Sequence, residues 1–159
     1  MEFLIYNTMA KKKEIFKPIE NGKVSLYTCG PTVYDFSHIG NFRTFIFEDL
    51  LKRWLLHLGY DVLHVMNITD VDDKTIKKSI DLKLSLEKVT NKYISEFMAD
   101  IEWLNLHPAD YFPKATDHVP EMILMISNLI KNKMAYTGED GSIYFDILSF
   151  KDYGKLASI

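Results

Sequence analysis

One pattern constrains the fold of this chain more than any other: a strand, a long helix and a second strand are predicted in succession. Residues 24–29 alternate between polar and apolar side chains and stop at a Gly-Pro pair, which predicts a strand. Apolar residues recur at helical spacing over residues 44–58 and end at Gly59, which predicts a helix. Residues 61–68 are mostly apolar and predict a strand buried on both faces. Together they predict a βαβ unit with a parallel sheet.

The segments that follow complete a doubly wound half and then change character. Short polar side chains at residues 69–73 suit a turn and a helix N-cap, and residues 85–104 carry the apolar face of a further helix. Prolines between residues 106 and 119 predict a connection rather than an element. A helix over residues 119–133 and a hairpin within residues 135–146 then predict a different layer or an inserted module. The predicted fold class is α/β.

Composition excludes several classes of protein. With 159 residues, 47% hydrophobic and 26% charged, the chain is one compact domain or a large piece of one. A single cysteine excludes an intramolecular disulfide framework. The chain shows no signal peptide and no stretch of the roughly 18 apolar residues that a membrane helix needs, so we expect a cytoplasmic protein with no membrane partner. The net charge of −3 supplies no global field for a nucleic acid, so such a partner needs a local patch.

Two polar segments are expected to meet at one edge of the predicted sheet. Residues 29–41 leave the first strand and enter the long helix, and residues 67–70 leave the second strand. In parallel sheets, ligands bind beyond the carboxyl ends of the strands, where helix N-termini offer unpaired N–H groups. These two segments therefore form the predicted ligand site.

The tetrapeptide His38-Ile39-Gly40-Asn41 lies within the first of these segments. Gly40 lets a ligand approach the backbone, while His38 and Asn41 can donate hydrogen bonds from one helical turn. This arrangement suits a nucleotide phosphate chain, and catalysis there is electrostatic, through stabilisation of charge on the α-phosphate. The alternative is structural: His38 caps the helix and Asn41 satisfies a turn.

Candidate metal ligands are few. Cys29 ends a strand at the predicted site, where a thiolate suits zinc, but a lone cysteine is also a common core residue. His57 and His64 are interpreted as parts of a helix and a strand. A zinc site made from these 159 residues alone is not expected, whereas a site to which Cys29 contributes one ligand is consistent with its position.

Three aspartates, Asp70, Asp72 and Asp73, follow the second predicted strand. Their carboxylates are of the kind that binds magnesium. At the junction of a turn and a helix, however, such residues more often act as caps and as partners of the helix dipole. We therefore interpret them as structural.

Ordered motifs along almost the entire chain resemble those of a known family. The motifs are Ile5-Tyr6-Asn7-Thr8, Phe16-Lys17-Pro18-Ile19, the stretch from Tyr27 to Asp35, His38 to Thr44, Asn67 to Lys74, Pro113-Lys114-Ala115-Thr116 and Tyr153-Gly154-Lys155-Leu156. With them the sequence resembles the amino-terminal part of the cysteinyl-tRNA synthetases, which are class I aminoacyl-tRNA synthetases. A HIGH-type tetrapeptide is shared by all class I synthetases and related nucleotidyltransferases, but the ordered set is specific.

The resemblance implies both a fold and an activity. It implies a Rossmann-type, HIGH-superfamily nucleotide-binding parallel sheet flanked by helices, with only its first half in residues 1–106. Residues 107–159 are then the start of a connective-peptide insertion with a helix and a hairpin. The implied reaction activates L-cysteine with ATP and Mg²⁺ to cysteinyl-adenylate and transfers the cysteine to tRNA(Cys).

The resemblance also implies roles for individual residues. Cys29 matches the first zinc ligand of the family, and a zinc ion bound by the substrate thiolate separates cysteine from serine without editing. The expected catalytic residues are His38 and Asn41, and the last position of the HIGH motif is Asn41 rather than His, a variant that the class tolerates. The residues expected to hold ATP are Gly30, His38, Gly40 and Asn41, and those expected at the amino-acid pocket are Thr32, Asn67 and Thr69.

Several parts of the family pattern are not found in the sequence. These are the other three zinc ligands, the KMSKS loop, the second half of the sheet and the anticodon-binding domain. We therefore expect an amino-terminal fragment or the product of a shortened gene, a monomer that alone binds ATP weakly if at all, holds no stoichiometric zinc and charges no tRNA. Two alternatives remain open: a paralogue that ligates cysteine to a small amine, and a non-catalytic nucleotide-binding module.

Overall fold

The structure is a computed structural model that describes residues 2–157. The chain divides into two compact units, one of residues 18–117 and the other of residues 2–17 with residues 118–157. The predicted boundary at residue 106 separates half of a catalytic domain from an inserted segment. A division into compact units does not test this boundary, so it stays a prediction. No helix among the described residues is long and apolar enough to span a membrane.

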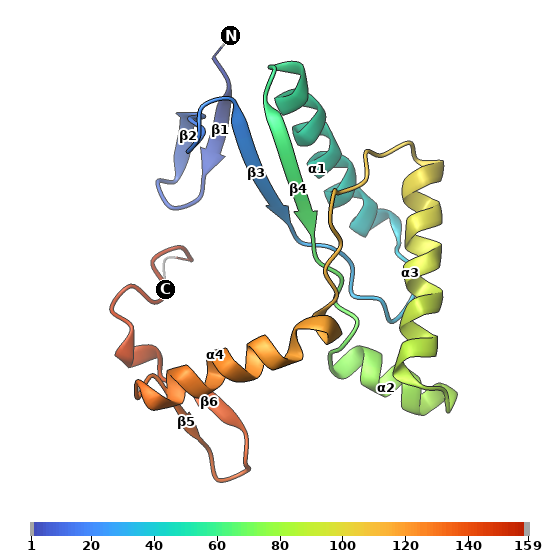
Figure 1. Ribbon diagram of the computed structural model, residues 1–159, viewed down its shortest axis with the longest axis vertical. Coiled ribbons are helices and arrows are strands. Elements are labelled where there is room, and N and C mark those ends of the chain that lie inside the picture. The colour runs from blue at the N-terminus through green and yellow to red at the C-terminus, as the bar shows by residue number, and fades with distance from the viewer. Residues whose placement is uncertain (1, 158–159) are drawn as a thin grey trace. The chain divides into compact units, whose positions relative to one another are not determined.

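The unit of residues 18–117 contains the predicted βαβ arrangement. Strands β3 (Lys23–Thr28) and β4 (Asp61–Met66) pair in parallel, in register from Lys23 opposite Asp61 to Thr28 opposite Met66. Helix α1 (Ile39–His57) connects them and packs against both, as Figure 1 shows. The α/β class is confirmed. Among the described residues, parallel pairing is limited to β3 with β4 and to isolated bridges.

Helix α1 begins at Ile39, earlier than the predicted start at Thr44. The reason is the side chain of His38, whose Nδ1 accepts a hydrogen bond from the Gly40 N–H, while the Asn41 side chain accepts one from the His38 N–H. These two bonds satisfy N–H groups that a helix start leaves unpaired, so the helix extends into a segment with few apolar residues.

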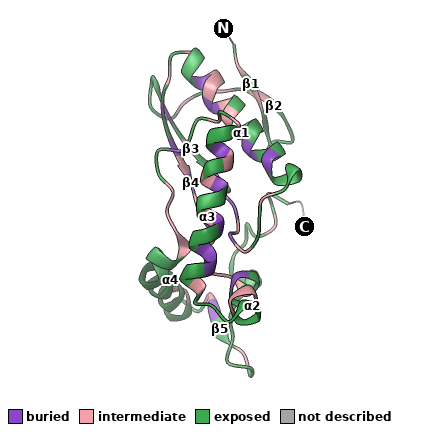
Figure 2. Cartoon of the chain, turned by 90° about the vertical axis from the view of Figure 1, so that its right-hand side faces the viewer, coloured by how far each residue is buried: buried purple, intermediate pink, exposed green. Residues whose placement is uncertain are grey.

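Two further helices cover this unit. Helix α2 (Asp73–Leu82) is capped by Asp72, and helix α3 (Leu86–Trp103) is capped by Ser85. Helix α3 presents a buried stripe along its length, which Figure 2 shows in purple. Its residues take part in two apolar clusters, one of Phe42, Phe45, Met66, Phe97, Ile101 and Ala109, the other of Val33, Ile68, Val89 and Tyr93.

The expectation that β4 is buried on both faces is wrong. Its burial alternates, because neighbouring side chains of a strand point to opposite faces and α1 packs on one of them. His64 is 1% exposed, whereas Leu63 is 48% exposed.

Residues 107–117 are more than the connection that their prolines predict. The Met66 N–H donates to the Tyr111 carbonyl at 3.0 Å, and the Ile68 N–H donates to the Pro113 carbonyl at 2.8 Å. The segment therefore runs along β4 through isolated bridges. Prolines lack an N–H but keep their carbonyl acceptor, so they interrupt a strand without preventing this pairing.

The second unit contains small antiparallel hairpins and a helix. Strands β1 (Leu4–Asn7) and β2 (Lys12–Ile15) form a hairpin that sequence analysis did not predict. The predicted carboxyl-terminal helix and hairpin are present as α4 (Val119–Lys131), β5 (Ala135–Thr137) and β6 (Ile143–Phe145). A short 3₁₀ helix, Ile147–Ser149, follows β6, and another, Ala115–His118, precedes α4 where the chain passes from the first unit to the second.

Candidate active site

The two polar segments predicted to meet do meet, beyond the carboxyl ends of β3 and β4. The Val33 N–H donates to the Thr69 carbonyl at 3.1 Å, and the Thr69 N–H donates to the Pro31 carbonyl at 3.0 Å. One residue further back, the Gly30 N–H donates to the Asn67 side-chain oxygen at 3.2 Å. The loops that leave the two strands are therefore held together as a short parallel extension of the strand pair.

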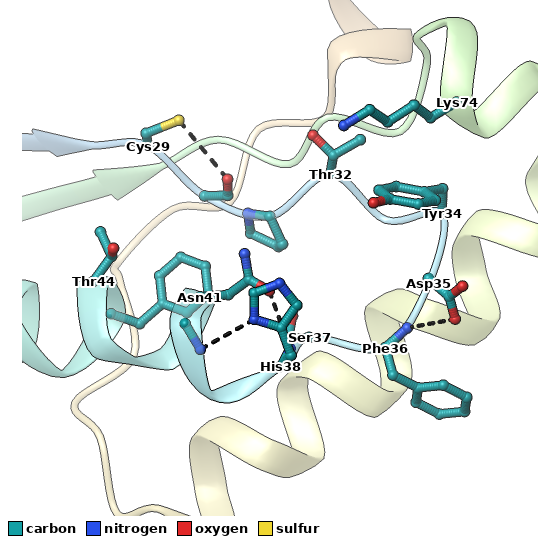
Figure 3. Close-up of a pocket in the computed structure, with 14 residues that line it drawn as sticks. Cys29, Thr32, Tyr34, Asp35, Phe36, Ser37, His38, Asn41, Thr44 and Lys74 are labelled. Atoms are coloured by element: carbon teal, nitrogen blue, oxygen red, sulfur yellow. Dashed lines mark hydrogen bonds between the residues drawn. The ribbon is translucent and has the colours of Figure 1, made fainter.

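A pocket of about 320 Å³ opens beside these loops (Figure 3). Six of the predicted site residues line it: Cys29, Gly30, Thr32, His38, Gly40 and Asn41. The other two, Asn67 and Thr69, do not line this pocket. They are joined by a hydrogen bond of 3.2 Å from the Asn67 amide to the Thr69 hydroxyl, and they support the pocket wall through the backbone contacts above.

His38 caps helix α1, which is the structural role considered as the alternative to nucleotide binding. The cap does not exclude nucleotide binding by the same side chain. Its Nδ1 accepts from the Gly40 N–H at 3.0 Å, so Nδ1 carries no proton and the neutral ring is protonated at Nε2. The cap thereby sets the tautomer, and it leaves an Nε2–H donor on a pocket-lining ring.

Two glycines of the site are required by close contacts. A Cβ atom on Gly30 would lie 1.8 Å from the Asn67 carbonyl oxygen, so no side chain fits between the two loops. A Cβ atom on Gly40 would lie 2.9 Å from Cε1 and 3.0 Å from Nδ1 of the His38 ring. The first glycine allows the strand ends to meet, and the second allows the imidazole to lie over the start of α1.

Cys29 is exposed at the end of β3, so its reading as a buried core residue is wrong. Its thiol lies 3.8 Å from the Gly30 carbonyl oxygen. Within residues 2–157, no group of three or more His, Cys, Asp or Glu side chains converges in a way that suits a metal. The described residues thus offer zinc one thiolate and not a complete ligand set.

The aspartates after β4 hold the structure together. Asp70 is buried, and its carboxylate accepts hydrogen bonds from the Thr116 N–H at 2.9 Å and from the Thr116 hydroxyl at 2.5 Å. Asp72 accepts from the Thr75 N–H at 2.8 Å and so caps α2. The expected cap is confirmed for Asp72, whereas Asp70 bonds to Thr116 and does not cap a helix.

Sequence analysis missed the contacts that hold the loop before His38. Asp35 forms an ion pair of 3.0 Å with Lys78, and this hydrogen bond holds the pKa of the Asp35 carboxyl below its usual value. The Phe36 ring meets the Tyr93 ring edge to face at 5.3 Å between centroids, and the Lys92 ammonium lies over both rings. These partners come from α2 and α3, distant in sequence, so no local pattern could reveal them.

Three buried polar side chains lie where α1 packs against β3 and β4: Thr28 on β3, Glu48 on α1 and His64 on β4. The hydroxyl of Thr28 lies 2.9 Å from the His64 Nε2, and Thr28 also hydrogen-bonds the Glu48 carboxyl. Burial raises the pKa of Glu48, which is 9% exposed and has one oxygen without a partner. Burial also lowers the pKa of the His64 imidazole, and the nearby Lys52 ammonium lowers it further. For Glu48 and for His64 alike, the shift in pKa favours the neutral form of the side chain.

The chain matches a known family over most of its length. Residues 15–159 match the tRNA synthetases class I (C) catalytic domain family. The chain belongs to this family. The family resemblance drawn from the motifs is thereby confirmed, and so is the class I synthetase catalytic fold.

Relatives within the family cover the whole chain. It is 55% identical over 159 residues to the cysteine–tRNA ligase of Chlamydia trachomatis serovar D and 49% identical over 155 residues to that of Protochlamydia amoebophila. The chain spans about a third of the length of these relatives: 33% of the first and 32% of the second.

A solved structure shares the fold. It is the LeuRS of Agrobacterium radiobacter K84 in a ternary complex with tRNA and LeuAMS, with a TM-score of 0.64 and 20% identity. The match covers 76% of this chain and 16% of that one. At this identity the likeness concerns the fold alone.

Proposed function

We propose that the protein activates L-cysteine with ATP to cysteinyl-adenylate and transfers the cysteine to tRNA(Cys). The observation that carries this proposal is the identity of 49–55% across the chain to relatives named cysteine–tRNA ligase. This naming favours tRNA over a small amine as the acceptor. We further propose that β3 and β4 belong to the first half of a Rossmann-type sheet, and that the protein works as a monomer in the cytoplasm.

The activation step joins a cysteine carboxylate oxygen to the α-phosphorus of ATP while the bond to the bridging oxygen of pyrophosphate breaks. Negative charge accumulates on the α-phosphate oxygens in the transition state. We assign the Nε2–H of His38 and the side-chain amide N–H groups of Asn41 to stabilise this charge, at the positive end of the α1 dipole. The carboxylate is itself the nucleophile, so the step needs no general base.

The remaining predicted residues have supporting roles in this proposal. Thr32 lines the pocket, while Asn67 and Thr69 hold its wall, so we assign these three to the amino-acid side. Gly30 and Gly40 permit the close approach of backbone and ring that the ATP side requires. Cys29 is the residue of this chain that we assign to zinc, as one ligand of a set that residues 2–157 do not complete.

Pyrophosphate exchange and intact mass test the proposal together. The protein, isolated from its source cell with an antibody against this segment, is weighed by mass spectrometry and assayed for cysteine-dependent ATP–pyrophosphate exchange and for charging of tRNA(Cys). Exchange and charging support the proposal, and their absence from the native protein contradicts it. The 159-residue chain, produced separately, is expected to hold less than stoichiometric zinc and to charge no tRNA.

A further inference from the structure

Lys74 is a cation in the pocket wall that the proposed mechanism leaves without a task. It belongs to the first turn of α2 and lines the pocket together with residues of the β3–α1 loop. In Figure 3 its ammonium group points toward Thr32, across the pocket from the His38 ring. The two nitrogen groups thus face the same space from two different elements.

The other lysines near this loop already have anionic or aromatic partners. Lys78 is paired with Asp35 at 3.0 Å, and the Lys92 ammonium lies over the rings of Phe36 and Tyr93. Lys74 makes a single contact of this kind, with its ammonium 5.2 Å from the centroid of the Tyr34 ring. Among residues 2–157, no carboxylate forms an ion pair with Lys74.

Three carboxylates near Lys74, those of Asp70, Asp72 and Asp35, are bonded to other groups. Asp70 accepts both of its described hydrogen bonds from Thr116, and Asp72 caps α2 through Thr75. Asp35 is the carboxylate among the pocket-lining residues, and it is paired with Lys78. Asp73, the neighbour of Lys74 in sequence, precedes it by one residue on α2, and adjacent helix positions do not face each other. The Lys74 ammonium lies over the Tyr34 ring at the pocket.

We propose that Lys74 binds an anionic oxygen of the ligand at the reaction centre, opposite the His38 donor. This inference rests on the proposed function, which brings two such groups into the pocket, the α-phosphate and the substrate carboxylate. The α-phosphate is the stronger candidate because the Nε2–H donor of His38 already faces the same space. A cation on the second side encloses the phosphate, so that its charge is met from both walls.

Paired ligands that differ by one charged group test the proposal. Dissociation constants are measured by calorimetry on the native-length protein for AMP against adenosine and for cysteine against cysteamine, which lacks the carboxylate. The variants are Lys74→Met, Lys74→Arg and the control Lys77→Met, which removes an exposed lysine that lies on the same helix and does not line the pocket.

We expect Lys74→Met to weaken AMP roughly 10-fold and adenosine by less than about 2-fold, since a hydrogen bond to a charged group is lost. Lys74→Arg should retain most of the AMP affinity, and Lys77→Met should match the wild type. Selective weakening of cysteine over cysteamine instead assigns the same cation to the carboxylate and also supports the proposal.

Two results overturn it, and they are distinguishable from a failure of the proposed function. Equal weakening of AMP and adenosine means that Lys74 acts by packing on Tyr34 rather than through its charge. Unchanged affinities for all four ligands mean that it has no role in binding. If the wild-type protein binds neither AMP nor cysteine, the proposed function fails, and this inference fails with it.

Discussion

At the scale of single residues, the site depends on His38 being both a cap and a donor. A side chain that accepts through Nδ1 and donates through Nε2 must hold one orientation, and the start of α1 imposes it. The absence of a Cβ atom on Gly40 leaves room for the ring to lie there. The residue between them, Ile39, is exposed and does not line the pocket.

We therefore expect Gly40→Ala to impair the site more than the fold. The added Cβ displaces a ring that lies within 3.0 Å of it, and AMP affinity should fall roughly 10-fold while the melting temperature changes little. Calorimetry and thermal melts measure the two effects, and Ile39→Ala is the control. Unchanged AMP affinity in Gly40→Ala would show that the ring position does not matter for binding.

Gly30 leads to the opposite expectation, a loss of stability. A Cβ atom at 1.8 Å from the Asn67 carbonyl forces the ends of β3 and β4 apart, and Gly30→Ala should cost roughly 1–3 kcal/mol, the usual range for overpacking. Ser25→Ala, at an exposed position of β3, should be near neutral. Urea unfolding of both variants measures the difference, and equal midpoints would contradict the contact.

At the scale of elements, the loop after β4 is held on two sides. The loop after β3 contacts it through backbone bonds, and residues 113–116 contact it on the other side through Ile68 and Asp70. The hydroxyl of Thr116 reaches the Asp70 carboxylate at 2.5 Å, and this carboxylate is buried. A buried carboxylate that loses a donor pays for desolvation without full compensation.

Removal of the Thr116 hydroxyl tests the hydrogen bond between Thr116 and Asp70. Thr116→Val should destabilise the unit of residues 18–117 by about 1–3 kcal/mol, because the buried Asp70 side chain loses a hydrogen-bond donor. Thr116→Ser keeps the hydroxyl and should recover most of the loss. Chemical denaturation of the two variants gives the comparison, and equal destabilisation by Ser and Val would mean that the methyl group matters instead.

At the scale of the whole molecule, the buried Glu48 makes stability depend on pH. Burial raises its pKa in the folded chain above the ordinary value of 4.5, so the folded state holds the proton more tightly than the unfolded state. This contribution to stability is fully present below 4.5 and is lost as the pH rises through the folded-state pKa. The same desolvation lowers the pKa of the buried His64 imidazole.

Glu48→Gln should remove this dependence. The variant is expected to melt at a higher temperature than the wild type at pH 8, and the difference should shrink as the pH is lowered toward 5. Thermal melts across this range measure it, with Glu96→Gln at an exposed position of α3 as the control. A constant difference between variant and wild type at all pH values would exclude titration of Glu48 as the cause.

Periodicity alone determined most of the elements and the class of the fold. The strands at 23–28 and 61–66, the helix at 86–103 and the carboxyl-terminal hairpin follow from local spacing of apolar residues and from turn residues. Topology then implied that the loops after the two parallel strands meet, because the carboxyl ends of such strands lie at one edge. The motifs added the family.

Only the tertiary structure decided which side chains act together. The pairing of Asp70 with Thr116, the contact of Lys78 with Asp35 and the position of Lys74 at the pocket join segments that no local pattern connects. The same holds for residues 107–117 beside β4, which become strand-like through partners elsewhere. The physical reason is that periodicity reports the local environment of a residue, whereas the charge and hydrogen bonding of a site depend on the groups that folding brings near it.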